Sequence, residues 1–226
     1  MGEPPAFTLL WCGDDSTPND RFAPILAGVA APRPVGPRPG RAIDPLLSGR
    51  VLVVGEDADL AAVALRLLRK DLLATVDLAY ATPDPTPLTR LHGLPVGPPA
   101  VDLARHGTAR EVTLVRDDVG GVLLGAGEIG PVTSGTVYVD DRRVLRGSAE
   151  RIRVTPDDAK GLAVTVVQRR VAGIFGPRPQ TVRGRAVQMG MAPTTVRSDG
   201  HDYPRPMDRW TFYKHTTSLR LVCPPR

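Results

Sequence analysis

Cysteine is scarce in this sequence: it occurs only as Cys12 and Cys223, near the two ends. With four dispersed histidines, these residues leave no spacing typical of a zinc site. Two such distant thiols fit a reducing compartment, although one disulfide joining the ends remains open. The sequence therefore favours a cytoplasmic protein with no metal site.

Long hydrophobic runs are also missing. No stretch approaches the 18 or so apolar residues of a membrane-spanning helix, so none is expected. The start, MGEPPAFTLLW, lacks a basic region followed by an apolar one, so we expect no secretion signal. The 226 residues, 42% of them apolar, suffice for one or two domains with a sizeable core.

Aromatic residues make up only 4% of the chain and are not interleaved with basic residues. Stacking surfaces for nucleic acid need such interleaving, so nucleic acid is not an expected partner. Basic residues are unevenly spread, because residues 1–140 carry 12 Lys and Arg against 17 Asp and Glu, whereas residues 141–226 carry 17 against 7. This excess favours an anionic lipid or membrane surface as partner, and hence peripheral association with a membrane.

The leading candidates for such a surface are arginines grouped beside expected strand ends. They are Arg142, Arg143, Arg169, Arg170, Arg183 and Arg185. The alternative is a compositional bias, since 26 of the 29 basic residues are arginine in a chain rich in Ala, Gly and Pro. The sequence leaves both readings open, and it does not indicate an oligomeric state.

The first part of the chain alternates between strand and helix patterns. Apolar runs predict buried strands at AFTLLWCG, GRVLVVG and ATVDLAYAT. Leu60, Val63, Ala64 and Leu67 share one face of a helix expected to begin near Leu60, and AVDLARHG predicts a shorter helix. This βαβα order favours a short parallel sheet in a reduced α/β lobe over residues 1–110.

From about residue 110 the pattern changes to short β-type runs separated by turn residues. The runs include GTVYVDD, RVLRGSAERIRVTP, LAVTVVQRR, TVRGRAVQMG, DRWTFYKH and SLRLVCP. Such spacing is typical of an antiparallel sandwich, which we expect over residues 111–226. The expected fold class is therefore α+β, with a reduced α/β lobe followed by a β-sandwich lobe.

The junction VLVVGEDADL combines a buried strand, a turn and the start of a helix. A glycine-rich turn at this place would bind phosphate through its backbone N–H groups. Here the turn reads Gly55, Glu56, Asp57, Ala58 and Asp59. Asp57 or Asp59 is instead well placed to cap the helix.

The order of these strings resembles that of bacterial diacylglycerol kinases and related lipid kinases, in the wider NAD kinase and diacylglycerol kinase superfamily. In that family a strand enters a GGDGT turn, a GTxNDxA turn follows one strand later, and a β-sandwich comes next. VLVVGEDADLAAVALRLL matches the first segment, and VDLAYATPDPTPLTRLHGLP matches the second. TTVRSDGHDYPRPMDRWTFYKHTTSLRLV resembles the closing section, whose final strand rejoins the body. The resemblance covers about residues 45–226.

The resemblance implies nucleotide-binding positions at 55–59 that have degenerated. Gly55 and Asp57 match GGDGT, whereas Glu56, Ala58 and Asp59 replace two glycines and the threonine. Side chains crowd the approach of a phosphate, and three carboxylates repel it. In the second turn, ATPDPTPLT has three prolines that lack donors. The family's late acid, the general base in a DGxLD-like string, corresponds to Ala163, and Asp157 and Asp158 nearby fit a loop.

Three functions follow from these observations. The leading one is a lipid kinase-like pseudoenzyme that binds a lipid or other anionic ligand and needs no cofactor. The first alternative is an active ATP-dependent lipid kinase that uses an altered, Mg²⁺-rich turn. The second is a structural module that docks a protein partner. The sequence gives no catalytic residue for the leading function.

Overall fold

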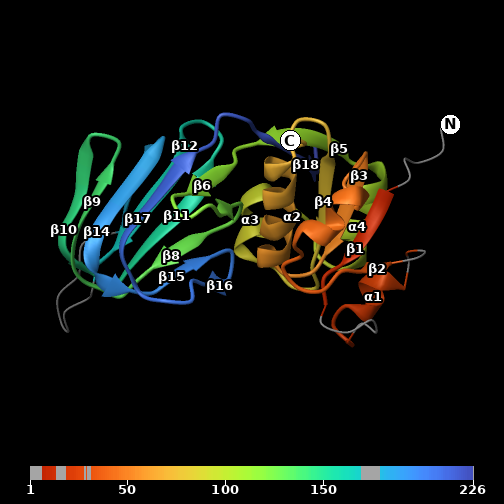
Figure 1. Cartoon of the computed structure of the whole chain (residues 1–226), viewed down its shortest axis with the longest axis horizontal. Coiled ribbons are helices and arrows are strands. Elements are labelled where there is room, and N and C mark those ends of the chain that lie inside the picture. The colour runs from red at the N-terminus through yellow and green to blue at the C-terminus, as the bar shows by residue number, and fades with distance from the viewer. Residues whose placement is uncertain (1–6, 14–18, 28, 30–31, 169–178, 226) are drawn as a thin grey trace. The chain divides into compact units, whose positions relative to one another are not determined.

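The computed structural model describes residues 7–13, 19–27, 29, 32–168 and 179–225. The chain forms two compact units: residues 1–112 with 217–226, and residues 113–216. Helices and strands are labelled in Figure 1. No helix among the described residues is both long and apolar enough to cross a membrane.

The first unit is built on a six-stranded sheet, called sheet A. Its strands, in spatial order, are β2 (Arg33–Pro34), β1 (Phe7–Trp11), β3 (Arg50–Val54), β4 (Asp77–Ala81), β18 (Leu219–Cys223) and β5 (Thr108–Val112). All neighbours are parallel except β18 and β5. The expected parallel sheet is confirmed, and the final strand pairs with β4 and β5, as the resemblance implies.

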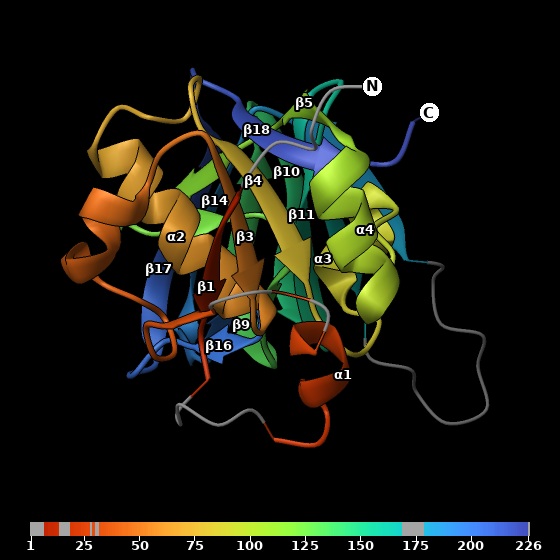
Figure 2. The same ribbon diagram turned by 90° about the vertical axis from the view of Figure 1, so that its right-hand side faces the viewer.

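Helices accompany sheet A on both faces. They are α1 (Ala23–Leu26), a 3₁₀ helix (Arg41–Leu46), α2 (Asp57–Arg69), α3 (Pro87–His92) and α4 (Pro98–His106). Figure 2 shows α2 on one side of β3 and β4 and α4 on the other. Alternate residues of β1 and β3, such as Trp11 and Val54, pack in one core cluster with the buried faces of α1 and α4. This two-sided burial explains why β3 is apolar at every position after Arg50.

The second unit contains two antiparallel six-stranded sheets. Sheet B has, in spatial order, β10 (Arg142–Ala149), β9 (Val132–Val139), β14 (Ala186–Thr194), β17 (Met207–Lys214), β6 (Val115–Asp117) and β7 (Val122–Leu123). Sheet C has β13 (Gln180–Gly184), β12 (Gly161–Val167), β11 (Arg151–Asp157), β8 (Gly127–Ile129), β15 (Val196–Ser198) and β16 (His201–Asp202). Buried residues of both sheets form one core that includes Trp210 and Phe212 of sheet B and Ile152 of sheet C. The predicted α+β fold with a β-sandwich is confirmed.

Three local expectations need correction. Helix α2 begins at Asp57 rather than near Leu60, because the Asp59 carboxylate closes its first turn. The proline-rich segment after β4, for which the sequence analysis predicts no helix, contains the helix α3. The run at 143–156, predicted as one β segment, divides into β10 and β11, which lie in different sheets.

Candidate functional site

The turn after β3 brings residues 55–59 together at the start of α2. Glu56 is the N-cap residue, and Asp57 and Asp59 lie in the first helical turn. The Asp59 carboxylate folds back and accepts the Glu56 backbone N–H at 2.7 Å through Oδ2. Asp59 therefore caps α2, but from inside the helix rather than from the N-cap position.

Asp59 also ties a second segment to the turn. Its Oδ1 accepts the backbone N–H of Arg38 at 2.7 Å. The side chain is only 4% exposed. The carboxylate lies so close to Gly55 that a Cβ atom there would stand 2.4 Å from Oδ2. The space beside Gly55 is therefore occupied by the chain's own carboxylate.

Asp57 joins the turn after β3 to the segment that matches the family's second turn. Its Oδ1 accepts the Tyr80 hydroxyl hydrogen at 2.9 Å, and its Oδ2 accepts the Leu88 backbone N–H at 3.3 Å. Leu88 belongs to the first turn of α3. A carboxylate is thus placed at the start of α3, where the helix dipole and free N–H groups favour negative charge.

The N-terminus of α3 is also closed by its own residues. Thr86 is the N-cap, and its hydroxyl accepts the Thr89 backbone N–H at 3.1 Å. The Thr89 hydroxyl accepts the Thr86 backbone N–H at 2.8 Å. Pro87 occupies the first helical position, where the absence of an N–H costs nothing. This arrangement explains how a proline-rich string still begins a helix.

Burial raises the pKa of Asp57, while its hydrogen bonds with Thr86, Tyr80 and Leu88 oppose the rise. Burial also raises the pKa of Tyr80 well above its ordinary value, and the neighbouring Asp57 adds to this. The two groups form a buried acid–phenol pair in which Tyr80 stays protonated and donates its hydrogen.

Several carboxylates surround Glu56 at the start of α2. Burial raises the pKa of Glu56, the nearby Asp59, Asp57 and Asp84 reinforce this, and Arg21 opposes it. Arg21 lies 3.6 Å from Glu56 and donates a hydrogen bond to Asp84 at 2.7 Å. The only cation paired with Glu56 among the described residues is therefore shared between two carboxylates.

The cysteines do not supply a reactive group. Both Cys12 and Cys223 are buried, and neither forms a disulfide. Burial raises the pKa of Cys12, and the Asp59 carboxylate raises it further, so the thiolate is disfavoured. In the part of the chain that the structure describes, no three His, Cys, Asp or Glu residues are grouped so as to hold a metal ion.

The late acids lie in the second unit and serve its loops. Ala163, which corresponds to the family's general base, lies in β12 and pairs with Thr155 and Arg183. Asp157 accepts the backbone N–H groups of Ala159 and Lys160 in the β11–β12 turn. Asp158 accepts the Thr113 backbone N–H at 3.1 Å.

Two further buried carboxylates of the second unit were missed by the sequence reasoning. Asp199 accepts three backbone N–H groups, from Leu124, Gly125 and Ala126, at 2.7 to 3.0 Å. Asp117 accepts those of Val119 and Gly121. Both fasten loops, and the Asp-Gly pair at Asp199 predicts only a turn.

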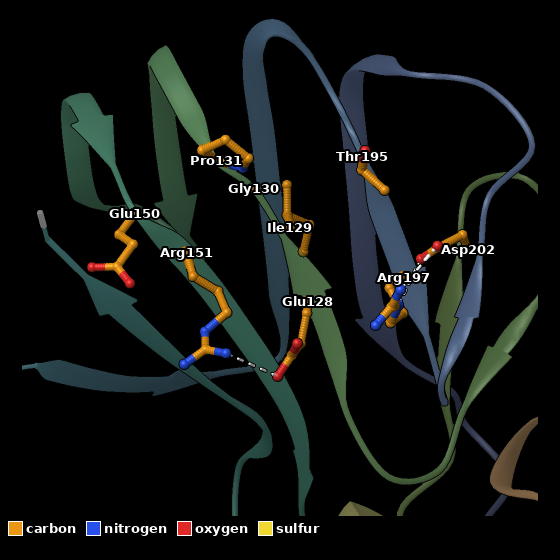
Figure 3. A pocket seen from close by; sticks show the side chains of 9 residues that line it. All are labelled: Glu128, Ile129, Gly130, Pro131, Glu150, Arg151, Thr195, Arg197 and Asp202. Carbon is orange, nitrogen blue, oxygen red and sulfur yellow. Dashed lines mark hydrogen bonds and ion pairs between the residues drawn. The ribbon is translucent and has the colours of Figure 1, made fainter.

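The second unit has a cavity of about 460 Å³ beside β8, β11 and β15 (Figure 3). Its charged lining residues are Glu128, Glu150, Arg151, Arg197 and Asp202. Arg197 binds Asp202 through two hydrogen bonds at 2.6 and 2.9 Å, and Arg151 lies 3.7 Å from Glu128. Because both guanidinium groups already face carboxylates, the cavity is poorly suited to an anion.

The candidate arginines do not form one group. Arg142 and Arg143 begin β10 of sheet B, whereas Arg183 lies in sheet C and binds Asp157 at 2.9 Å. Arg185 is exposed between β13 and β14. Arg169 and Arg170 lie outside the described residues.

The chain thus combines a largely parallel sheet, with helices that start at its carboxyl edge, and a β-sandwich in a second unit. No family model matches the sequence, and no curated protein matches it significantly. A diacylglycerol kinase from Bacillus anthracis strain Sterne matches the fold with a TM-score of 0.69 and 12% identity, over 100% of this chain and 99% of that chain. An NAD kinase from Archaeoglobus fulgidus, solved in complex with ATP, matches with a TM-score of 0.58 and 13% identity, over 96% and 92%. Yeast NADH kinase, complexed with NADH, matches with a TM-score of 0.57 and 9% identity, over 98% of this chain and 84% of that chain.

These matches show that the chain shares its fold with these diacylglycerol kinase and NAD kinase structures. They agree with the resemblance found in the sequence. At such low identity they establish the fold alone.

Proposed function

We propose that this chain is a diacylglycerol kinase-like protein that does not transfer phosphate and acts by binding a lipid or another anionic ligand. One observation carries the proposal. The helix starts of both motif segments bind carboxylates of the chain itself, α2 through Asp59 and α3 through Asp57.

The chemistry of phosphoryl transfer explains why this matters. Such enzymes work mainly by positioning phosphates and neutralising their charge with backbone N–H groups, cations and metal ions. Here the Glu56 and Arg38 N–H groups are bonded to a buried carboxylate, so neither is available to a phosphate. The excess of carboxylates around the turn further disfavours a polyphosphate.

The position of the late acid gives independent support. Ala163 has no group that can accept a proton from a lipid hydroxyl, and the nearby Asp157 is engaged by two backbone N–H groups and Arg183. A general base must reach the proton that it removes. The chain therefore lacks the base at the position that the family uses.

Two measurements test the proposal. Calorimetry with ATP and Mg²⁺ should show no binding, and labelled-phosphate transfer from ATP to a panel of lipids should give no product. Turnover that disappears in Asp57→Ala would overturn the proposal in favour of an active ATP-dependent lipid kinase.

The ligand is tested separately by mass spectrometry of lipids that co-purify with the chain. A bound lipid supports the proposal. A chain that purifies without lipid and binds none from vesicles would favour a module that docks a protein partner.

A further inference from the structure

The outward face of sheet B carries basic side chains that have few acidic partners among the described residues. Across the sheet, Arg143, Tyr138, Gln188 and Thr211 form one row by register, and Arg146, Thr136, Gly190 and Arg209 form the next. The residues between these rows, such as Val137 and Met189, face the core. Strand alternation, together with the register shift between Arg143 and Leu145 in β10, therefore puts three exposed arginines on one face of the sheet.

These arginines differ from those of the cavity in sheet C. Among the described residues, Arg143 and Arg146 form no ion pair, and Arg209 has only a contact of 3.9 Å with Asp208. The Arg209 side chain is 82% exposed. Asp118 lies near this face and accepts the Thr211 backbone N–H at 3.3 Å. No acidic residue stands in either cross-strand row.

The centre of this surface is open. A Cβ atom at Gly190 would meet nothing within 4 Å, and Thr136 beside it is small. Arg146 and Arg209 flank these two residues, three strand spacings apart, or about 14 Å. Arginine side chains can reach into such a space and donate to phosphate oxygens. The surface thus suits several neighbouring phosphate groups.

Tyr138 adds an amphipathic group to the same surface. It is 41% exposed, whereas the other described aromatic residues of this unit are buried or half-buried. Tyrosine is favoured at the boundary between lipid and water because its ring is apolar and its hydroxyl is polar.

We propose that this outward face, defined by Arg143, Arg146, Arg209 and Tyr138, docks on the surface of an anionic phospholipid bilayer. This proposal rests on the proposed function in one respect, the choice of an anionic lipid as the partner. The charge of this face, three arginines and no acid in either row, is complementary to an anionic bilayer. Single-stranded nucleic acid would need successive exposed aromatics, and Tyr213 is half-buried with the Arg116 guanidinium 5.8 Å from its ring.

The test is co-sedimentation of the full chain with vesicles, in the absence of nucleotide and across a salt series. Wild type should bind vesicles of equal phosphatidylglycerol and phosphatidylcholine far better than pure phosphatidylcholine. The triple variant Arg143→Gln, Arg146→Gln, Arg209→Gln should bind the anionic vesicles about 100-fold more weakly, at roughly fivefold for each arginine. Its salt dependence should also be shallower.

Three variants make the test specific. Arg33→Gln, Arg41→Gln, Arg205→Gln removes the same charge from exposed positions elsewhere and should bind more than tenfold better than the first triple. Lysine at all three surface positions should retain most of the binding. Tyr138→Ala should weaken binding without changing the salt slope, because it removes apolar contact and no charge.

Three results would overturn the proposal. The first is equal binding to neutral and anionic vesicles, and the second is an equal loss of binding in the two glutamine triples. The third is unchanged vesicle binding in the first triple together with lost binding of single-stranded DNA, which would identify a nucleic-acid surface. None depends on ATP binding or phosphate transfer, so the two proposals can fail separately.

Discussion

Asp57 and Asp59 are acidic residues in the most buried part of the turn, and each is stabilised by donors from other segments. Asp59 joins the turn to Arg38, and Asp57 joins it to Tyr80 and α3. A buried carboxylate is costly unless it is hydrogen-bonded. These partners therefore make two otherwise unfavourable residues part of the scaffold.

Removing Asp59 should destabilise the protein. Asp59→Ala leaves the Glu56 and Arg38 N–H groups without this acceptor, so we expect a loss of about 1–3 kcal/mol in the free energy of unfolding. The double variant with Asp57→Ala should melt at a still lower temperature and keep any ligand binding. Thermal melting measures the change, with exposed Asp102→Ala as the matched control. Unchanged melting together with lost ligand binding would instead mean a functional site.

Asp57 should also give stability a dependence on pH. Burial raises its folded-state pKa above 3.8, so folding favours its protonated form. This contribution is fully present below the unfolded pKa and is lost as pH rises through the raised folded pKa. Relative to Asp57→Asn, wild type should therefore lose stability from about pH 4 upward and then level off. Denaturant unfolding of both chains across pH is the measurement, and a parallel pair of curves would contradict the assignment.

At this scale the sequence predicts the residue types but not their partners. The acids after Gly55 indicate a helix cap, and Asp59 acts as one. Nothing in the string identifies Tyr80 or Arg38 as partners, because those contacts depend on how β4 and the loop after β2 fold against the turn.

The junction between β3 and α2 depends on a close approach at Gly55. A Cβ there would lie 2.4 Å from Asp59 Oδ2 and 3.0 Å from the Cys12 Cβ. Gly55→Ala should cost about 1–3 kcal/mol because a buried methyl group must displace packed atoms. Gly40→Ala, where nothing lies within 4 Å, should cost much less. Chemical denaturation compares the two, and equal costs would show that the turn can relax.

The strand β18 should be essential to the first unit. It supplies Leu219, Leu221 and Val222 to the core and lies between β4 and β5 in sheet A. Without residues 217–226, β5 loses its partner strand and β4 one of its two, and buried apolar surface becomes exposed. A chain truncated at residue 216 should lose the unfolding transition of the first unit. A melting curve identical to that of the full chain would refute this.

The sequence predicts some helices and strands better than others. Strong apolar runs predict β1, β3 and β4, because burial on both faces of a sheet requires them. Helix α3 is missed because prolines at 85 and 87 suggest a break, whereas Pro87 occupies the helical position that proline favours. The division between β10 and β11 is missed because the bend at Glu150 has no glycine or proline to mark it.

The two units of the molecule should differ in autonomy. Residues 113–216 are continuous in sequence and have their own core from both sheets. We therefore expect a fragment of residues 113–216 to unfold cooperatively by itself. Circular dichroism during heating tests this, and a fragment with no cooperative transition would show that the unit depends on the rest of the chain.

The return of β18 to sheet A has a consequence for the order in which the protein forms during synthesis. Arg220 in β18 donates to Asp77 at 2.7 Å, a contact between residues 143 positions apart. While the ribosome is still adding the intervening residues, sheet A has a gap between β4 and β5, and the edge of β4 is unpaired. The second unit can fold in that interval, because all its strands emerge first. The nascent first unit is therefore the part exposed to wrong pairing, and the part that chaperones would need to shield.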